Sequence, residues 1–311
     1  MTVVTPTIDV IVPVYGNWQI TSSCLDSLRT QTVPHRVILV DDKSPDDTLD
    51  RVTAEFPEVD VVALPQNRGF AAACNAGISA GTGAIVVLCN NDVEAEPEML
   101  ERLATAFVDP HVGSATPLLL RPDGRVDAFG ITVDATLAGF VRLHGRPESA
   151  ASGDLDRLLG PYGAVAAYRR SALEQVGLLD EGIFMYGEEL DLALRLSAGG
   201  WMPAAVVGAR AVHLGGATAG RGSPSQRRRA GFGRGYLLRA WRVHRTRHGA
   251  RAIAVEAIVV AADAAIHRDL AAFRGRRAGW VAGRHATRPL AVPDIDDSIG
   301  LIKSLRLRLA R

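Results

Sequence analysis

The residues best placed to do chemistry are carboxylates that directly follow apolar runs. Asp41 and Asp42 follow the run VILV, and the triplet Asn90-Asn91-Asp92 follows AIVVLC. A carboxylate in such a position can accept hydrogen bonds from a ribose or a base, or it can bind a hard divalent cation together with diphosphate oxygens. The alternative for both clusters is structural, because acids also stabilise turns and the first turn of a helix.

A second group of acids opens the amphipathic segment EELDLALRLSAGGW (188–201). At about 100° per residue, Glu188, Asp191 and Arg195 share one face of a helix, and Glu189 points away from Asp191. An i,i+4 pair between Asp191 and Arg195 is therefore predicted, which favours a structural role for Asp191. Acids also stabilise a helix N-terminus, but two adjacent acids at the mouth of a sheet would suit a general base beside a substrate hydroxyl.

Two further observations limit the kind of ligand. His213 follows the apolar strand ARAV, where a lone histidine is more often a hydrogen-bonded structural residue than a metal ligand. No G-x-G-x-x-G follows the first strand and no G-x-x-x-x-G-K-[ST] occurs, which disfavours NAD, FAD and P-loop nucleotides. A nucleotide bound here would need another counter-charge for its diphosphate, which Mg²⁺ or Mn²⁺ at Asp92 could supply.

The elements that must position these residues alternate between strand and helix. Apolar runs rich in β-branched residues predict buried strands at 8–14, 36–41, 59–64 and 84–89. Helical spacing predicts helices at 17–31, 44–56 (with Ser44 as its cap) and 70–80. This order predicts βαβ units in a parallel sheet, where ligands bind beyond the carboxyl ends of the strands.

The pattern changes after Asp92. A helix is expected at 97–108, a strand and a short helix at 160–177, and a pair of strands at 204–214. Gly, Ser, Thr and Pro dominate 215–225, and Arg-rich helical stretches follow. The predicted organisation is an α/β domain at 1–220 and a basic helical extension at 221–311.

Composition supports this division and excludes several classes of protein. Of the 311 residues, 47% are hydrophobic and 22% are charged, which is ordinary globular usage and excludes a disordered, collagenous or coiled-coil chain. Residues 1–220 hold 15 Lys and Arg against 28 Asp and Glu, whereas residues 221–311 hold 20 against 6. The three cysteines have no metal-ligand spacing, so buried reduced thiols are expected.

The chain start lacks a basic n-region and a cleavage site, so no signal peptide is expected. The run AIAVEAIVVAADAAI (252–266) is interrupted by Glu256 and Asp263 and is shorter than the roughly 20 residues of a membrane span. A cytoplasmic protein is therefore predicted. The basic extension could place it on the inner face of the plasma membrane.

The whole set of motifs resembles the family 2 inverting glycosyltransferases of the GT-A fold, and among them the bacterial cell-envelope rhamnosyltransferases and galactofuranosyltransferases. The matching segments, in the family's order, are VIVPVYGNWQITSSCLDSLRTQT, VILVDDKSPDDT, LPQNRGFAAACNAGISAGTGAIVVLCNND, AYRRSALEQVGLLDEGIFMYGEELDLALRL and VHLGGATAGR. They cover residues 8–221. The resemblance implies a Rossmann-like nucleotide-binding half with a mixed central sheet.

The resemblance also implies roles for individual residues. Glu189 matches the second acid of the family's E-D pair, the catalytic base, with Glu188 and Asp191 supporting it. Asp92 is the last acid of the D-x-D position and His213 completes the metal site, although Asn90 replaces the first acid and leaves metal dependence open. The residues implied to contact the donor are Pro13, Tyr15, Asp41, Asp42, Asn67, Arg68, Gly69, Asn75, Asn91, Thr218 and Arg221.

The implied reaction is an inverting transfer of a sugar from a nucleoside-diphosphate sugar to an acceptor hydroxyl, in the synthesis of a cell-envelope polysaccharide or glycolipid. dTDP-rhamnose is the favoured donor and a UDP-sugar is second; the acceptor would be a glycan or a lipid-linked glycan. The alternative is a catalytically inactive nucleotide-sugar-binding or scaffold protein. The basic extension (221–311) could contact an anionic membrane, a second copy in a homodimer or only solvent. Nucleic acid is disfavoured because no aromatic side chains interleave with the arginines.

Overall fold

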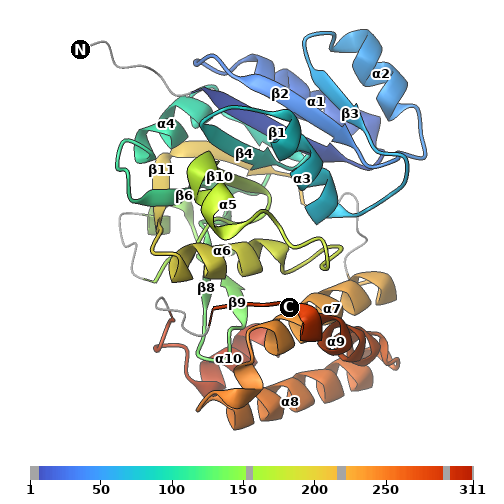
Figure 1. Ribbon diagram of the computed structural model, residues 1–311, viewed down its shortest axis with the longest axis vertical. Helices are drawn as coiled ribbons and strands as arrows, with labels where there is room; N and C mark the ends of the chain where they lie inside the picture. The colour runs from blue at the N-terminus through green and yellow to red at the C-terminus, as the bar shows by residue number, and fades with distance from the viewer. Residues whose placement is uncertain (1–6, 152–156, 216–221, 290–294, 310–311) are drawn as a thin grey trace.

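A computed structural model describes residues 7–151, 157–215, 222–289 and 295–309 (Figure 1). The strands are β1 (Ile8–Val14), β2 (Arg36–Asp41), β3 (Asp60–Ala63), β4 (Ile85–Cys89), β5 (Val93–Ala95), β6 (Val112–Leu120), β7 (Val126–Ala128), β8 (Ile131–Val133), β9 (Gly139–Val141), β10 (Val165–Arg169) and β11 (Met202–His213). The α-helices are α1 (Trp18–Arg29), α2 (Thr48–Glu55), α3 (Phe70–Ala80), α4 (Met99–Ala106), α5 (Arg170–Val176), α6 (Glu188–Ala198), α7 (Pro224–Ala240), α8 (Gly249–His267), α9 (Ala271–Ala282) and α10 (Leu301–Leu309). Short 3₁₀ turns are η1 (Glu148–Ala151), η2 (Val243–Arg245) and η3 (Gly283–His285).

The central sheet is mixed, as the resemblance implies. Its main path has the order β3-β2-β1-β4-β10-β6-β11-β5. The first four strands are parallel, β10 runs antiparallel to both of its neighbours, and β11 is parallel to β6. The parallel half is the one whose carboxyl ends carry Asp41 and the Asn90-Asn91-Asp92 triplet.

Helices cover both faces of the sheet because alternate residues of each strand point to opposite sides. In β1, Val10 and Val12 join a core with α1, α2 and α4, whereas Ile11 joins a core with α3, α5 and α6. The near-continuous apolar runs of the predicted strands follow from this two-sided burial. Cys24, Cys74 and Cys89 are buried and free, as expected.

Two local expectations are wrong. The predicted pair of strands at 204–214 is one strand, β11, whose register to β6 shifts between Val206 and Arg210. The second helix begins at Thr48 and not at 44, because the Ser44 hydroxyl accepts a hydrogen bond from the Gly16 amide (2.7 Å) and holds the end of β1 instead of capping α2. Side chains near a strand end compete for such bonds, and tertiary contacts decide the outcome.

The C-terminal helices pack onto the end of the molecule opposite β2 and β3 (Figure 1). Leu190 and Leu194 of α6 share a core with Leu237 of α7 and with Trp241. α7 and α9 approach closely through glycines: a Cβ atom at Gly279 would lie 1.9 Å from the Phe232 carbonyl oxygen. The helices therefore share a core with α6, the helix whose second residue is the predicted catalytic base. No helix in the described part of the chain is long and apolar enough to cross a membrane.

Candidate active site

The two predicted metal ligands lie together at one edge of the sheet. His213 is the last residue of β11, and it pairs in register with Val93 of β5, directly after Asp92. Asp92 Oδ1 is 3.3 Å from His213 Nε2, and each side chain is about nine-tenths buried. A backbone hydrogen bond from Leu214 to the Asp92 carbonyl oxygen, 2.9 Å long, holds the two segments side by side.

A third residue, Asp127 of β7, positions the histidine ring. Asp127 Oδ2 accepts a hydrogen bond from His213 Nδ1 at 2.7 Å, which leaves Nε2 facing Asp92. Burial lowers the pKa of His213, but the hydrogen bonds to Asp127 and Asp92 outweigh it and raise that pKa to about 9. Sequence reasoning missed Asp127 because a single acid in a short apolar stretch carries no signal of its own.

The chemistry of this pair fits a divalent cation only when the substrate supplies further ligands. A carboxylate oxygen and an imidazole nitrogen are suitable donors, and a carboxylate behind the imidazole is the usual arrangement at metal-binding histidines. The described residues contain no group of three or more His, Cys, Asp or Glu that could hold a metal by themselves. Asp92 and His213 thus fit a cation whose remaining ligands are diphosphate oxygens and water.

Glu189, at the N-terminus of α6, lies against the same loop as His213. Its side chain is half-buried, and its Oε2 accepts a hydrogen bond from the Gly187 amide at 3.1 Å. A Cβ atom built on Gly163 would lie 3.7 Å from Glu189 Cγ, and the neighbouring Tyr162 ring packs edge-on against His213 with centroids 6.3 Å apart. The loop before β10 therefore lies between the predicted base and the predicted metal ligands.

Glu188 is buried beside Glu189, and its Oε2 has no hydrogen-bond partner within the part of the chain that the structure describes. Burial raises the pKa of Glu188 well above its usual range, and the neighbouring charge of Glu189 raises it further. A buried carboxyl with these neighbours favours its neutral form. The adjacent acids therefore lie in different surroundings, and only Glu189 is partly open to solvent.

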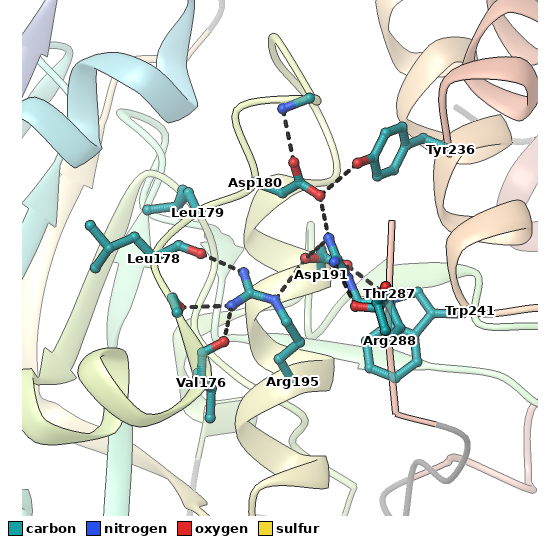
Figure 2. A network of polar contacts seen from close by, with 12 residues as sticks. Val176, Leu178, Leu179, Asp180, Asp191, Arg195, Tyr236, Trp241, Thr287 and Arg288 are labelled. Atoms are coloured by element: carbon teal, nitrogen blue, oxygen red, sulfur yellow. Dashed lines mark hydrogen bonds and ion pairs between the residues drawn. The ribbon is translucent and has the colours of Figure 1, made fainter. Parts of the chain in front are cut away.

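Asp191 is part of a buried ionic network (Figure 2). The predicted pair with Arg195 is confirmed at 2.9 Å, and the Arg195 guanidinium also donates to three carbonyl groups of 176–178. Asp191 accepts further hydrogen bonds from Trp241 Nε1 (2.9 Å) and Arg288 Nε (2.7 Å). Its carboxylate therefore ties α6 to the C-terminal helices.

The same network continues to Asp180, which Arg288 and the Tyr236 hydroxyl both contact. Gly233 of α7 lies so close to the turn before α6 that a Cβ atom there would be 1.8 Å from the Tyr186 carbonyl oxygen. Any larger residue at Gly233 would have to displace backbone, so α7 is pressed against the turn that presents Glu189. The C-terminal helices thus position the start of α6.

The two acids at the end of β2 have different partners. Both carboxylate oxygens of Asp42 accept backbone hydrogen bonds, from Arg68 (2.7 Å) and Gly69 (2.8 Å). Burial raises the pKa of Asp42, although these two hydrogen bonds oppose the rise. Asp41 accepts from the Ser44 amide at 3.1 Å. Asp42 therefore shapes the turn at Arg68 and Gly69, while Asp41 lies at the strand end that Tyr15 flanks.

The other predicted donor contacts are spread around this end of the sheet. Tyr15, Asn67 and Arg68 are exposed, and Pro13 is half-buried. The Asn75 amide exchanges two hydrogen bonds with the Leu179 backbone (2.9 and 3.1 Å), so it holds the loop before α6.

The Asn91 amide donates to Thr21 Oγ1 at 2.9 Å, which ties the triplet to α1. Thr218 and Arg221 lie outside the described residues. A hollow of about 500 Å³ beside the Asp180–Arg288 contact is lined by none of the described residues that are predicted to bind donor or metal. This hollow is therefore not the predicted donor site.

Residues 9–177, more than half of the chain, match the family described as Glycosyl transferase family 2. The chain belongs to this family. Among its relatives within the curated proteins, the O-antigen biosynthesis protein RfbC of Myxococcus xanthus is 30% identical over 220 residues, which are 67% of this chain and 17% of that protein. The N-acetylglucosaminyl-diphospho-decaprenol L-rhamnosyltransferase of Mycobacterium tuberculosis H37Rv is 27% identical over 225 residues, 60% of this chain and 68% of that protein. The family 2 chain thus spans less than a fifth of the first relative.

Two solved structures show the same GT-A fold. The mannosyltransferase PcManGT from Pyrobaculum calidifontis, in complex with GDP-Man and Mn²⁺, has a TM-score of 0.52 at 19% identity and covers 90% of this chain and 86% of its own. GalNAc-T7 with UDP, GalNAc and Mn²⁺ has a TM-score of 0.58 at 15% identity and covers 76% of this chain and 50% of its own. At such identities the likeness establishes the fold of this family 2 glycosyltransferase.

Proposed function

We propose that this chain is an inverting glycosyltransferase that moves a sugar from a nucleoside-diphosphate sugar to an acceptor hydroxyl in cell-envelope glycan or glycolipid synthesis. The observation that carries the proposal is the grouping of Glu189, Asp92 and His213 around the loop before β10. Membership of the family supports glycosyl transfer as the reaction. The grouping supports Glu189 as the base and Asp92 and His213 as the metal ligands.

In this proposal Glu189 takes the proton from the acceptor hydroxyl. The acceptor oxygen forms its bond to the anomeric carbon from the side opposite the diphosphate, and the bond between that carbon and the diphosphate oxygen breaks. The configuration at the anomeric carbon is inverted because attack and departure occur on opposite faces. Glu189 suits the role since it is half-buried at the start of α6 and lies beside Gly163 and Tyr162, next to His213.

Asp92 and His213 would hold a divalent cation together with the donor. When bound, Mg²⁺ or Mn²⁺ neutralises charge on the departing diphosphate. Mn²⁺ is expected to bind more tightly than Mg²⁺, because an imidazole nitrogen is a softer donor than the oxygen ligands that Mg²⁺ prefers. Asp127 would hold the ring of His213 in the orientation that this requires.

The identity of the sugar rests on similarity alone. A relative named as an L-rhamnosyltransferase supports dTDP-rhamnose as the first donor to test, with UDP-sugars second. The name of that relative includes an acceptor with a decaprenol chain, which supports a lipid-linked glycan as acceptor and a membrane surface as the place of the reaction.

The proposal is tested by transfer from dTDP-rhamnose and from UDP-sugars in the presence of Mg²⁺ or Mn²⁺, with the Glu189→Gln variant beside the wild type. Because general-base catalysis typically contributes about 10²–10⁴-fold, Glu189→Gln should lower kcat by that factor. Donor affinity, measured by calorimetry, should stay near the wild-type value.

The matched control is Glu174→Gln, an exposed glutamate in the neighbouring helix α5, which should retain wild-type turnover. Equal kcat for Glu189→Gln and wild type would refute the assigned base. A wild type that binds nucleotide sugars but transfers none of them would favour the inactive binding or scaffold protein.

A further inference from the structure

The outer face of α8 is apolar along the length of the helix. Its exposed positions from 252 to 266 are all alanine or isoleucine: Ile253, Ala254, Ala257, Ile258, Ala261, Ala265 and Ile266. Ile253 and Ile266 expose 62% and 69% of their surface. Side chains of this size that are exposed in a row on one helix are unusual on a surface that meets only water.

The two acids of α8 do not interrupt this face, because both point toward other helices. Glu256 is buried and bonds the guanidinium groups of Arg234 (2.7 Å), Arg276 (2.8 Å) and Arg308 (2.6 Å). Asp263 bonds Arg227 at 2.8 Å. The helix is therefore amphipathic in the reverse sense, with its charges directed inward and its apolar side chains outward.

An apolar groove adjoins this face. It has a volume of about 410 Å³ and lies among α7, α8 and α9. Its lining includes Ile253, Phe273, Trp280, Val281 and Arg277. Phe273 and Val281 of α9 are themselves about half exposed, so the apolar surface extends from α8 across the groove to α9.

The exposed charges of residues 242–289, which form α8, α9 and the turns beside them, have one sign. Every charged residue between 242 and 289 that is exposed is an arginine: Arg242, Arg245, Arg247, Arg268, Arg274, Arg277 and Arg284. The acids of the same range are Glu256, Asp263 and Asp269, and all three are paired with arginines. An apolar face with a cationic border matches an anionic lipid surface. Two copies joined through the same face would bring like charges together, which disfavours a homodimer there.

We infer that the outer face of α8 and the adjoining groove insert among the lipids of an anionic bilayer surface, with the exposed arginines contacting lipid headgroups. Not every arginine of the basic extension is available for this, since Arg227 pairs with Asp263 and Asp269. The inference rests on the proposed function in one respect: a lipid-linked acceptor would be present at the membrane surface to which α8 binds.

The test is flotation of the whole chain with phosphatidylcholine vesicles, with and without phosphatidylglycerol. The wild type should float with the mixed vesicles, and the combined variant Ile253→Gln, Ile258→Gln and Ile266→Gln should lose binding by about tenfold or more. Val108→Gln is the matched control, since Val108 is 83% exposed but lies after α4 on the sheet side. Part of the binding should remain in about 1 M salt, where the Debye length is about 3 Å and headgroup attraction is screened.

Several outcomes would overturn the inference. Unchanged flotation of the triple variant would overturn it. Complete loss of wild-type binding in high salt would also overturn it, because binding would then depend on attraction to headgroups without insertion. A wild type that is dimeric by light scattering and a triple variant that is monomeric would assign the face to a second copy.

The flotation readout is independent of catalysis. If the wild type floats but transfers no sugar, the proposed function fails while the lipid-binding face stands. If the wild type transfers sugar to a water-soluble acceptor but does not float, the lipid-binding face fails alone.

Discussion

The sheet-containing part of the chain and the C-terminal helices differ in how much apolar surface and how many ion pairs they expose. Several ion pairs around the sheet, such as Arg29–Glu58 and Arg36–Asp60, join side chains that are 41–51% exposed, although the pairs Arg170–Asp9 and Arg195–Asp191 are largely buried. The pairs of Glu256 with Arg234, Arg276 and Arg308 join side chains that are only 9–17% exposed. Conversely, ten of the fourteen exposed large apolar side chains among the described residues lie after residue 250.

This difference separates two ways of holding a structure together. Around the sheet, apolar side chains from alternate faces of each strand fill the core, and many ion pairs lie at the surface, whereas the pair of Asp191 with Arg195 in α6 is buried. In the helical region, part of the core is a cluster of one acid and three arginines, and the apolar side chains that would ordinarily fill it face outward. The basic composition of this region is therefore partly internal and only partly available to an external partner.

The largest effect should come from breaking the internal cluster. Glu256→Gln leaves three buried arginines without a counter-charge and should lower the free energy of unfolding by about 3–5 kcal/mol. Thermal unfolding followed by circular dichroism measures the change. Glu58→Gln, the same substitution in an exposed pair, should cost at most about 1 kcal/mol. If the two variants lose the same free energy of unfolding, the buried pairs of the helical region stabilise the protein no more than the exposed pairs around the sheet.

The Glu256 cluster also predicts a dependence on pH. Burial raises the pKa of Glu256, but the charges of Arg234, Arg308 and Arg276 outweigh it and hold that pKa well below its usual range. A carboxyl with a lowered folded-state pKa stabilises the fold above its unfolded pKa of about 4.3, and this contribution is lost as the pH falls toward the folded value. The stability difference between wild type and Glu256→Gln should therefore shrink below about pH 4.

A smaller effect is expected for Asp127, which acts at the sheet edge through His213. Asp127→Asn weakens the hydrogen bond that orients the ring and should lower Mn²⁺ affinity by about 10–100-fold. Calorimetric titration with Mn²⁺ in the presence of a nucleoside diphosphate measures this without any turnover. Asp123→Asn, in the exposed turn of the same hairpin, is the control and should bind Mn²⁺ like the wild type. If Asp127→Asn binds Mn²⁺ as tightly as the wild type, Asp127 has no role in metal binding.

The smallest effect concerns Glu188, where the sheet-containing part carries a buried carboxyl without the arginines that surround Glu256. Its pKa is raised mainly by burial, so its stabilising contribution is complete below the unfolded pKa and is lost as the pH rises through the folded value. Glu188→Gln should therefore raise the free energy of unfolding by about 1 kcal/mol at about pH 8, and by less at about pH 5. If Glu188→Gln is less stable than the wild type at high pH, a neighbouring group must stabilise the charged carboxylate of Glu188.

The parallel strands and the positions of the chemical groups at their ends could be predicted from local sequence. β1 and β2 have the predicted bounds, because a buried parallel strand is a continuous apolar run whatever its neighbours are. The pair of Asp191 with Arg195 was predictable for the same reason, since helical geometry alone places residues four apart on one face.

Contacts between distant segments were not predictable in this way. Ser44 matches the pattern of a helix cap, yet its hydroxyl holds the Gly16 amide, because two backbone donors compete for one acceptor and the fold decides between them. Asp127 carries no local signal, and its role exists only because β7 lies next to the end of β11.

The sequence by itself determined the alternation of strands and helices, the acids at the strand ends and the charge contrast between the two parts, since each depends on residues that are neighbours in the chain. Only the tertiary structure decided that Glu256 and Asp263 point inward to arginines and leave α8 with an uninterrupted apolar outer face. The physical reason is that the two acids are stabilised inside the protein only because the packing of α7, α9 and α10 brings guanidinium groups next to them. The pattern of residues within one helix does not contain that information.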